Sequence, residues 1–310
     1  MILAADIGGT HARLALFGGA DTTPRATAVY PTGDWPSAEA MVRRFREDYP
    51  ATLSAACLAV AAPVLHGRAG RVNLPWPVDE HRLRDALELE RIALVNDLEA
   101  NARGIALLGP DDLAVVNPGV PDERGTKVVV SAGTGLGEAA LVRDGAHSIA
   151  VAGEGGHADF APRSDIELQL YTHLAARYPH VSYERVCSGQ GLANIYSFLD
   201  GGERRSAAAI AADAESDPSG TAAKALRLFT SIYGARAANV ALSFMATGGV
   251  YLGGGIAPRN LRSLTNGEFM RAFTAKGRLS SLLETIPVYV VLEDRAALFG
   301  AAAIAADLTA

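Results

Sequence analysis

Near its beginning the chain reads Ile2-Leu3-Ala4-Ala5-Asp6-Ile7-Gly8-Gly9-Thr10, an apolar run that ends in a carboxylate and a glycine turn. The run predicts a strand over residues 2–7, and residues 13–17 and 25–30 predict two further strands. Because glycine has no side chain, such a turn lets the main chain approach a phosphate closely and point its N–H groups at it. We therefore expect an antiparallel meander that carries a candidate phosphate site.

Two more glycine turns follow apolar runs, at Ala132-Gly133-Thr134-Gly135-Leu136-Gly137 and at Gly253-Gly254-Gly255. One such turn taken alone is typical of an ordinary hairpin. Three of them in a chain of 310 residues favour a nucleotide that is held by backbone amides.

Strands and helices alternate along the rest of the chain, as in an α/β protein. After the meander, the first part is predicted to hold a helix after Ser37, a strand, a short helix capped by Asp79, a strand and a helix. These five elements are expected at residues 38–49, 55–62, 80–87, 92–95 and 98–108.

The second part repeats the order of strand, glycine turn and strand, and then becomes mainly helical. Ser164 and Glu167 fit a capping box that opens a helix, residues 213–220 look like a polar loop, and the last helix is expected to pack on the first domain. The predicted strands are residues 127–131, 138–142, 250–252 and 287–292, and the predicted helices are residues 165–178, 221–244 and 295–306.

Composition favours small-molecule chemistry over several other classes of function. The formal net charge of -6 argues against nucleic-acid binding, and no apolar run approaches the ~18 residues of a membrane helix. The amino terminus has no basic leader segment, so we expect a cytoplasmic protein. Cys57 and Cys187 belong to no CxxC pair, which makes buried thiols a better expectation than a disulfide or a zinc site.

The first candidate for catalysis is Asp97, which with Asn96 follows the predicted strand at residues 92–95. Open α/β sheets place their ligand sites at the carboxyl ends of strands, where a carboxylate can accept a proton from a substrate hydroxyl. Asn96 can hold the same hydroxyl. Asp97 also suits the N-cap of the following helix, so the spacing alone leaves both roles open.

A second candidate site is the loop Gly153-Glu154-Gly155-Gly156-His157-Ala158-Asp159. Glu154 can accept hydrogen bonds from sugar hydroxyls, and His157 can both donate and accept. A metal site is disfavoured because no cysteine cluster completes a ligand set, and a structural loop with a satisfied histidine is the plainer alternative. Glu184 is either a third carboxylate of this pocket or a solvated charge.

Together these stretches resemble the bacterial glucokinases of the proteobacterial type, which lack the zinc-binding signature of the ROK sugar kinases. The stretch from Asp6 to Thr10 resembles the first phosphate motif of that family, residues 132–137 the second, and residues 248–256 its adenosine motif. The sugar-binding region is matched by Glu154-Gly155-Gly156-His157 and Glu184-Arg185-Val186. The resemblance runs over nearly the whole chain.

The resemblance implies an α/β fold of two ribonuclease-H-like (actin-like ATPase) domains that flank a cleft. Because water competes with the sugar as acceptor, we expect the domains to close over glucose. The small domain would comprise residues 1–108 plus 294–310, and the large domain residues 109–293. A homodimer is also implied.

The resemblance further implies the roles of individual residues. Asp97 would act as the base on the 6-hydroxyl of the sugar. For the transfer of the phosphoryl group, we further expect Asp6 to orient Mg²⁺ through water. The residues implied to hold the sugar are Asn73, Asn96, Asp97, Glu154, His157 and Glu184. Those implied to hold ATP, as a phosphate clamp and an adenosine floor, are Asp6, Gly8, Gly9, Thr10, Gly133, Thr134, Gly135, Gly254 and Gly255.

Two positions depart from the family pattern. Val72 stands before Asn73 where the family more often has Thr, which weakens the assignment of Asn73, and His11 stands where Asn commonly follows the first motif. The implied reaction is ATP-dependent phosphorylation of glucose to glucose 6-phosphate, with no nucleic acid or membrane as partner. Another hexose, another phosphoryl donor such as polyphosphate, an actin-like ATPase and a sugar-sensing protein without kinase activity are the alternatives.

Overall fold

A computed structural model describes residues 1–19, 22–145, 147–202 and 205–309. The chain divides into two compact units, the first formed by Met1–Gly109, Asp144–Ala152 and Glu293–Ala310, and the second by Pro110–Arg143 and Gly153–Leu292. Compact units are not by themselves folding domains, so the domain boundaries given by the resemblance stay a prediction.

The first unit is built on a five-stranded sheet with the order β3-β2-β1-β4-β8. The first three strands pair antiparallel, which confirms the predicted meander, and β1 pairs parallel with β4 and β4 with β8. The strands are β1 (Ile2–Ile7), β2 (His11–Phe17), β3 (Ala26–Pro31), β4 (Ala55–Val60) and β8 (Ile92–Asn96).

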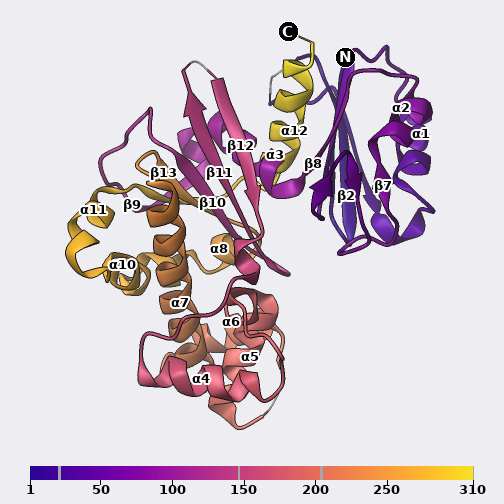
Figure 1. Cartoon of the computed structure of the whole chain (residues 1–310). Helices are drawn as coiled ribbons and strands as arrows, with labels where there is room; N and C mark the ends of the chain where they lie inside the picture. The colour runs from indigo at the N-terminus through magenta and orange to yellow at the C-terminus, as the bar shows by residue number, and fades with distance from the viewer. Residues whose placement is uncertain (20–21, 146, 203–204, 310) are drawn as a thin grey trace. The chain divides into compact units, whose positions relative to one another are not determined.

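Helices cover both faces of this sheet. Successive residues of a strand point to opposite faces, so each face has its own set of side chains that pack against helices. Leu3, Ala5 and Ile7 pack with the first two helices, whereas Ile2 and Ala4 pack with the last helix of the chain (Figure 1). The helices are α1 (Ala38–Asp48), α2 (Glu80–Leu87), α3 (Asp97–Gly104) and α12 (Ala296–Asp307).

Two features of the first unit position the candidate residues Asp97 and Asn73. Helices α3 and α12 touch backbone to backbone, since a Cβ at Gly300 would overlap the carbonyl oxygen of Ala100 and one at Gly104 that of Ala296. A small sheet follows β4, with the loop that carries Asn73 between its second and third strands. Its strands are β5 (Val64–Leu65), β6 (Arg68–Ala69) and β7 (Val78–Asp79).

The second unit contains the strand order β11-β10-β13-β14-β9 of a six-stranded mixed sheet. The hairpin of β10 and β11 is antiparallel, and β10, β13 and β14 run parallel. These strands are β9 (Leu113–Asn117), β10 (Lys127–Ala132), β11 (Leu136–Asp144), β13 (Gly249–Gly253) and β14 (Val288–Val291). The sixth strand, β12 (His147–Gly153), belongs almost entirely to the first unit.

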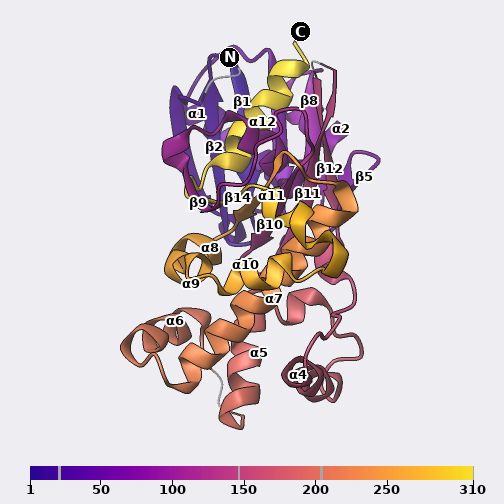
Figure 2. The ribbon, with the colours of Figure 1, turned by 90° about the vertical axis from the view of Figure 1, so that its left-hand side faces the viewer.

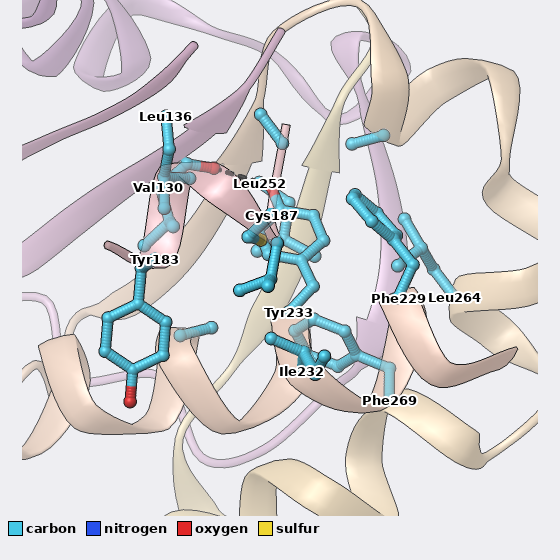
Figure 3. Close-up of a cluster of buried hydrophobic side chains, with 14 of the residues drawn as sticks. Val130, Leu136, Tyr183, Cys187, Phe229, Ile232, Tyr233, Leu252, Leu264 and Phe269 are labelled. Carbon is cyan, nitrogen blue, oxygen red and sulfur yellow. Dashed lines mark hydrogen bonds between the residues drawn. The ribbon is translucent and has the colours of Figure 1, made fainter. Parts of the chain in front are cut away.

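The long helix α7 (Thr221–Phe244) is the spine of the second unit, with α4, α5 and α6 gathered at its far end from the sheet (Figures 1 and 2). Tyr233 of α7 is fully buried and donates a 2.7 Å hydrogen bond to the carbonyl oxygen of Val130 in β10 (Figure 3). The other helices are α4 (Asp165–Ala175), α5 (Gly189–Asp200), α6 (Ala207–Ser216), α8 (Ile256–Arg259), α9 (Leu261–Thr265), α10 (Glu268–Thr274) and α11 (Ser280–Thr285).

Three details correct the sequence-based expectations. Residues 213–216 form the last turn of α6 rather than a loop, because Ser206 caps the start of that helix and the side chain of Ile210 anchors it in the core. Helix α3 ends at Gly104 and continues only as a 3₁₀ turn over Ile105–Leu107. Ser164 does cap α4, but the Glu167 carboxylate accepts from the backbone N–H of Arg163 and not from that of Ser164.

In the described part of the chain no helix is both long and apolar enough to span a membrane.

Candidate functional site

The first glycine turn joins β1 to β2 as a hairpin, closed by a 2.9 Å hydrogen bond from the N–H of Gly8 to the carbonyl oxygen of His11. Fully buried Thr32 supports it from the side: its hydroxyl donates to the carbonyl oxygen of Gly8 at 2.7 Å, and its N–H to that of Thr10 at 2.9 Å. Thr32 was missed from the sequence, where no motif distinguishes it. The turn is therefore shaped by a contact between segments 22 or more residues apart.

Asn73 is brought to this turn by the small sheet. A Cβ at Gly9 would lie 2.5 Å from the carbonyl oxygen of Asn73, so only glycine lets the two backbones approach this closely. A sugar-side residue predicted from the resemblance thus lies beside the first predicted phosphate turn, within one unit.

Asp6 lies one residue before the end of β1, directly opposite Arg13 in β2. Burial raises the pKa of Asp6 to about 6, an effect that Arg13 opposes and that Asp294 reinforces. Arg13 is itself held by Asp294, with 2.9 Å between Nη2 and Oδ2. Asp6 is therefore a largely buried carboxylate beside the first glycine turn, with a guanidinium nearby.

Asn96 and Asp97 stand where β8 passes into α3. The N-cap is Asn96: its Oδ1 accepts from the N–H of Leu98 at 2.9 Å, and its Nδ2 donates to the carbonyl oxygen of Ala62 at 3.1 Å. Asp97 is the first residue of the helix, so the N-cap role considered for it is wrong, although its Oδ1 also accepts from the N–H of Leu98. The positive end of the helix favours a negative charge at this position.

The register of the sheet places Asp97 on the same edge as the first glycine turn. Ile7 is level with Val60, and Val60 is level with Asn96. Because neighbouring strands are about 4.8 Å apart, the ends of β1 and β8 are separated by roughly 10 Å. The first unit thus gathers Asp6, Gly8, Gly9, Thr10, Asn73, Asn96 and Asp97 at one sheet edge and the loop beside it.

The second glycine turn joins β10 to β11 and is closed by a 2.9 Å hydrogen bond from the N–H of Gly133 to the carbonyl oxygen of Gly135. Glu184 belongs to this turn, because its Oε2 accepts from the N–H of Leu136 at 3.1 Å. Its description as a solvated charge is therefore wrong. The N–H of Gly189, which opens α5, donates to the carbonyl oxygen of Gly133 at 2.8 Å.

The third glycine turn follows β13 and lies against the second. Gly254 has a φ of +76°, and a Cβ there would collide with the carbonyl oxygen of Ala132, the last residue of β10. Gly255 follows at the start of the short helix α8. The predicted adenosine motif and second phosphate motif are thus neighbours, as the parallel pairing of β10 and β13 requires.

Glu154 and His157 flank the two glycines of the second-unit loop. The residues from Gly155 to His157 form a single 3₁₀ turn, closed by a 3.0 Å hydrogen bond from the N–H of His157 to the carbonyl oxygen of Glu154. Both side chains are more than half exposed, and Nε2 of His157 lies 3.8 Å from Oε2 of Glu154. Two polar groups thus reach solvent side by side, where they can bind a polyhydroxylated ligand.

A buried ion pair under this loop was also missed from the sequence. Glu138 of β11 and Arg236 of α7 are 98 residues apart and form two hydrogen bonds of 2.6 Å. Arg236 lies in an alanine-rich helix whose pattern signals only helicity, so nothing local reveals its partner.

Both cysteines are buried and free, and burial raises the pKa of each thiol. Within the described residues, no group of three or more His, Cys, Asp or Glu side chains is arranged to hold a metal ion.

Comparisons with known proteins show what the whole chain is similar to. A sequence model of the glucokinase family matches residues 3–308. A glucokinase from Synechocystis sp. is 37% identical, and the match covers 98% of each chain. The crystal structure of a glucokinase from an Antarctic psychrotroph superposes with a TM-score of 0.89 at 32% identity, over 99% of this chain and 98% of the other.

A more distant structure carries the same fold. A ROK family glucokinase from Streptomyces griseus, solved in complex with glucose and AMPPNP, superposes with a TM-score of 0.65 at 19% identity, over 99% of each chain. These similarities confirm the predicted α/β fold of two ribonuclease-H-like, actin-like units.

Proposed function

This chain belongs to the glucokinase family, and we propose that it transfers the γ-phosphoryl group of ATP to the 6-hydroxyl of glucose, giving glucose 6-phosphate and ADP. The observation that carries the proposal is the common sheet edge of the first unit, where Asp97 directly follows β8 and the Gly8–Gly9 turn directly follows β1. A base for the acceptor and a cradle for the donor thus lie at the same edge of one sheet.

Asp97 takes the proton of the 6-hydroxyl as the bond from oxygen to phosphorus forms. A general base must lie within hydrogen-bond reach of that proton, and the positive end of α3 favours a negative charge at this position. Asn96 assists by binding a sugar hydroxyl. The amide of Asn96 donates one hydrogen bond to Ala62 and accepts one from Leu98. It has a second N–H group and a second acceptor position.

The sugar's remaining hydroxyls are bound by Asn73 and by three residues of the second unit, Glu154, His157 and Glu184. Oε2 of Glu184 is engaged by the N–H of Leu136, so Oε1 is the atom that we assign to the sugar. The carboxylates of Glu154 and Glu184 accept hydrogen bonds, and the imidazole of His157 can do either.

The phosphates of ATP are bound by main-chain N–H groups of the first two turns. The N–H groups of Gly8 and Gly133 close their own hairpins, so we assign phosphate binding to Gly9, Thr10, Thr134 and Gly135. Gly254 and Gly255 form the floor for adenosine. Fixed N–H groups of this kind stabilise the charge of a loose, metaphosphate-like transition state without reorganisation.

Magnesium fits the donor chemistry of Asp6, a hard carboxylate oxygen beside the first turn. Mg²⁺ keeps several water ligands in such sites and neutralises phosphate charge, so one protein carboxylate that acts through water is sufficient. We infer from the resemblance alone a homodimer, cytoplasmic residence and a place in glycolysis.

A coupled assay for sugar 6-phosphate tests the proposal with the wild-type protein. We expect glucose 6-phosphate to form only when ATP, Mg²⁺ and glucose are all present. Mannose, fructose, glucosamine and polyphosphate in place of glucose or ATP test the alternative acceptors and donors. Release of ADP with no phosphorylated hexose would contradict the proposal and favour an ATPase.

A further inference from the structure

We propose that Arg236 and Glu138 are positioning residues that set the shape of the Glu154–His157 loop and thereby the affinity for the sugar. The inference rests on the proposed function of that loop. It concerns two side chains that carry no motif in the sequence and contact neither phosphate turn through their own charged groups.

The ion pair of Arg236 and Glu138 is buried and bidentate. Nε and Nη2 of Arg236 donate to Oε1 and Oε2 of Glu138, each at 2.6 Å, and the two side chains are only 12% and 7% exposed. A bidentate arginine–carboxylate pair has one preferred planar arrangement, which a lysine cannot reproduce. The guanidinium therefore has a defined orientation on the surface of α7.

That orientation is transmitted directly to the loop. Nη2 of Arg236 donates a third hydrogen bond, of 2.8 Å, to the carbonyl oxygen of Gly155. A Cβ at Gly155 would collide with Oε2 of Glu138, and a Cβ at Gly156 would collide with the carbonyl oxygen of Leu136. The two glycines thus let the loop lie flat on the ion pair and on the first residues of β11.

The polar side chains on either side of the glycines depend on this contact between the loop and the ion pair. Glu154 and His157 are exposed and joined to each other at 3.8 Å, and neither is anchored by the core. Their directions follow from the backbone between them, which Arg236 holds at Gly155. A shift of about 1 Å in a substrate-positioning group can cost ~100-fold in rate. We therefore expect a loop that is held less firmly to bind the sugar more weakly.

The same arginine also supports the segment that carries Glu184. Its guanidinium lies 4.6 Å from the centre of the Tyr183 ring, and Tyr183 in turn receives a 3.0 Å hydrogen bond from Nδ2 of Asn239. Tyr183 is buried and adjoins Glu184 in one 3₁₀ turn. Arg236 therefore lies beneath both sugar-binding segments of the second unit.

The competing explanation is an ion pair that only stabilises the core. Buried ion pairs are often replaceable without loss of stability, since desolvation offsets their attraction, so stability alone does not explain this one. The two explanations differ in what a conservative change does to glucose binding.

The experiment compares Arg236→Lys and Glu138→Gln with a matched control, Arg163→Lys. Arg163 also pairs with a buried glutamate of the second unit, Glu167, at 2.6 Å, but at the start of α4. Calorimetry measures the Kd for glucose without nucleotide, steady-state kinetics give the KM for ATP, and thermal melts report folding.

We expect each variant of the pair to raise the Kd for glucose at least about tenfold, the effect of losing one charge-assisted hydrogen bond, with the KM for ATP changed less than about twofold. Arg163→Lys should lower the Tm and leave the Kd for glucose unchanged. Because each single change breaks the same pair, the double variant should be no worse than the poorer single variant.

Folded variants with wild-type glucose affinity, or with equal losses for glucose and ATP, would overturn the inference while the wild type still makes glucose 6-phosphate. A wild type that binds no glucose would instead overturn the proposed function. If Arg236→Lys does not fold, Glu138→Gln, which keeps the shape of the side chain, decides the question alone.

Discussion

The hydroxyl of Thr32 donates a 2.7 Å hydrogen bond to the carbonyl oxygen of Gly8, and so the segment after the last strand of the meander holds the first glycine turn. Thr32 follows β3 directly, and its N–H holds Thr10 on the far side of the same turn. The orientation of the N–H groups that we assign to phosphate is thereby linked to a fully buried side chain.

Replacing Thr32 with Val removes the hydroxyl at nearly constant volume. We expect the KM for ATP to rise about 5-fold to 10-fold and the free energy of unfolding to fall by about 1–3 kcal/mol, because the carbonyl oxygen of Gly8 loses a buried donor. Thr32→Ser keeps the hydroxyl and serves as the control. If Thr32→Val and Thr32→Ser have the same KM for ATP, the hydroxyl of Thr32 does not contribute to nucleotide binding.

Helix α3 is held against α12 at Gly300, which has no room for a methyl group. Gly300→Ala should therefore push the two helices apart and displace Asp97 at the start of α3. We expect a loss of about 1–3 kcal/mol in the free energy of unfolding, typical of overpacking, and a fall in kcat larger than any rise in the KM for ATP. Ala303→Gly on α12 is a control that weakens helix propensity without adding volume. A wild-type melting curve for Gly300→Ala would refute the close packing.

Asp6 should make the Mg²⁺-free protein less stable as the pH rises. Its pKa is raised from 3.8 to about 6, so the folded state binds the proton more tightly than the unfolded state. The stabilisation is complete below pH 3.8 and is lost as the pH rises through about 6, at most about 3 kcal/mol in all.

Denaturant unfolding in EDTA measures this effect. At pH 8 Asp6→Asn should be more stable than the wild type by up to about 3 kcal/mol, yet inactive, and the advantage should disappear towards pH 4. The exposed Asp85→Asn is the control and should match the wild type at both pH values. An Asp6→Asn protein no more stable than the wild type at pH 8 would show that Asp6 is not strained by burial.

Much of the fold follows from local signals in the sequence. Ser37 and Asp79 both accept hydrogen bonds from the first turns of their helices, as predicted, because a cap needs only residues within the same turn. The alanine-rich helical pattern predicted the bounds of α7, and the glycine turns marked the ends of β1, β10 and β13. The existence and type of these elements are decided within short windows.

What the sequence could not show depends on partners far along the chain. Thr32 is 24 residues from Gly8, and Arg236 is 98 residues from Glu138, so neither role leaves a local pattern. The choice of N-cap between Asn96 and Asp97 is decided by Ala62, which holds the Asn96 amide across the sheet edge. Tertiary contacts thus explain both the missed residues and the wrong cap.

Asp97 is the proposed base of the reaction. The most direct measurement is kcat for glucose 6-phosphate formation by Asp97→Asn, which keeps the size of the side chain and a hydrogen-bonding group. We predict a fall of at least ~100-fold, the lower range for a general base, with an unchanged melting temperature. The control is Asp79→Asn, the same change at the N-cap of α2, which should keep near-normal turnover. Near-normal turnover by Asp97→Asn would contradict the account.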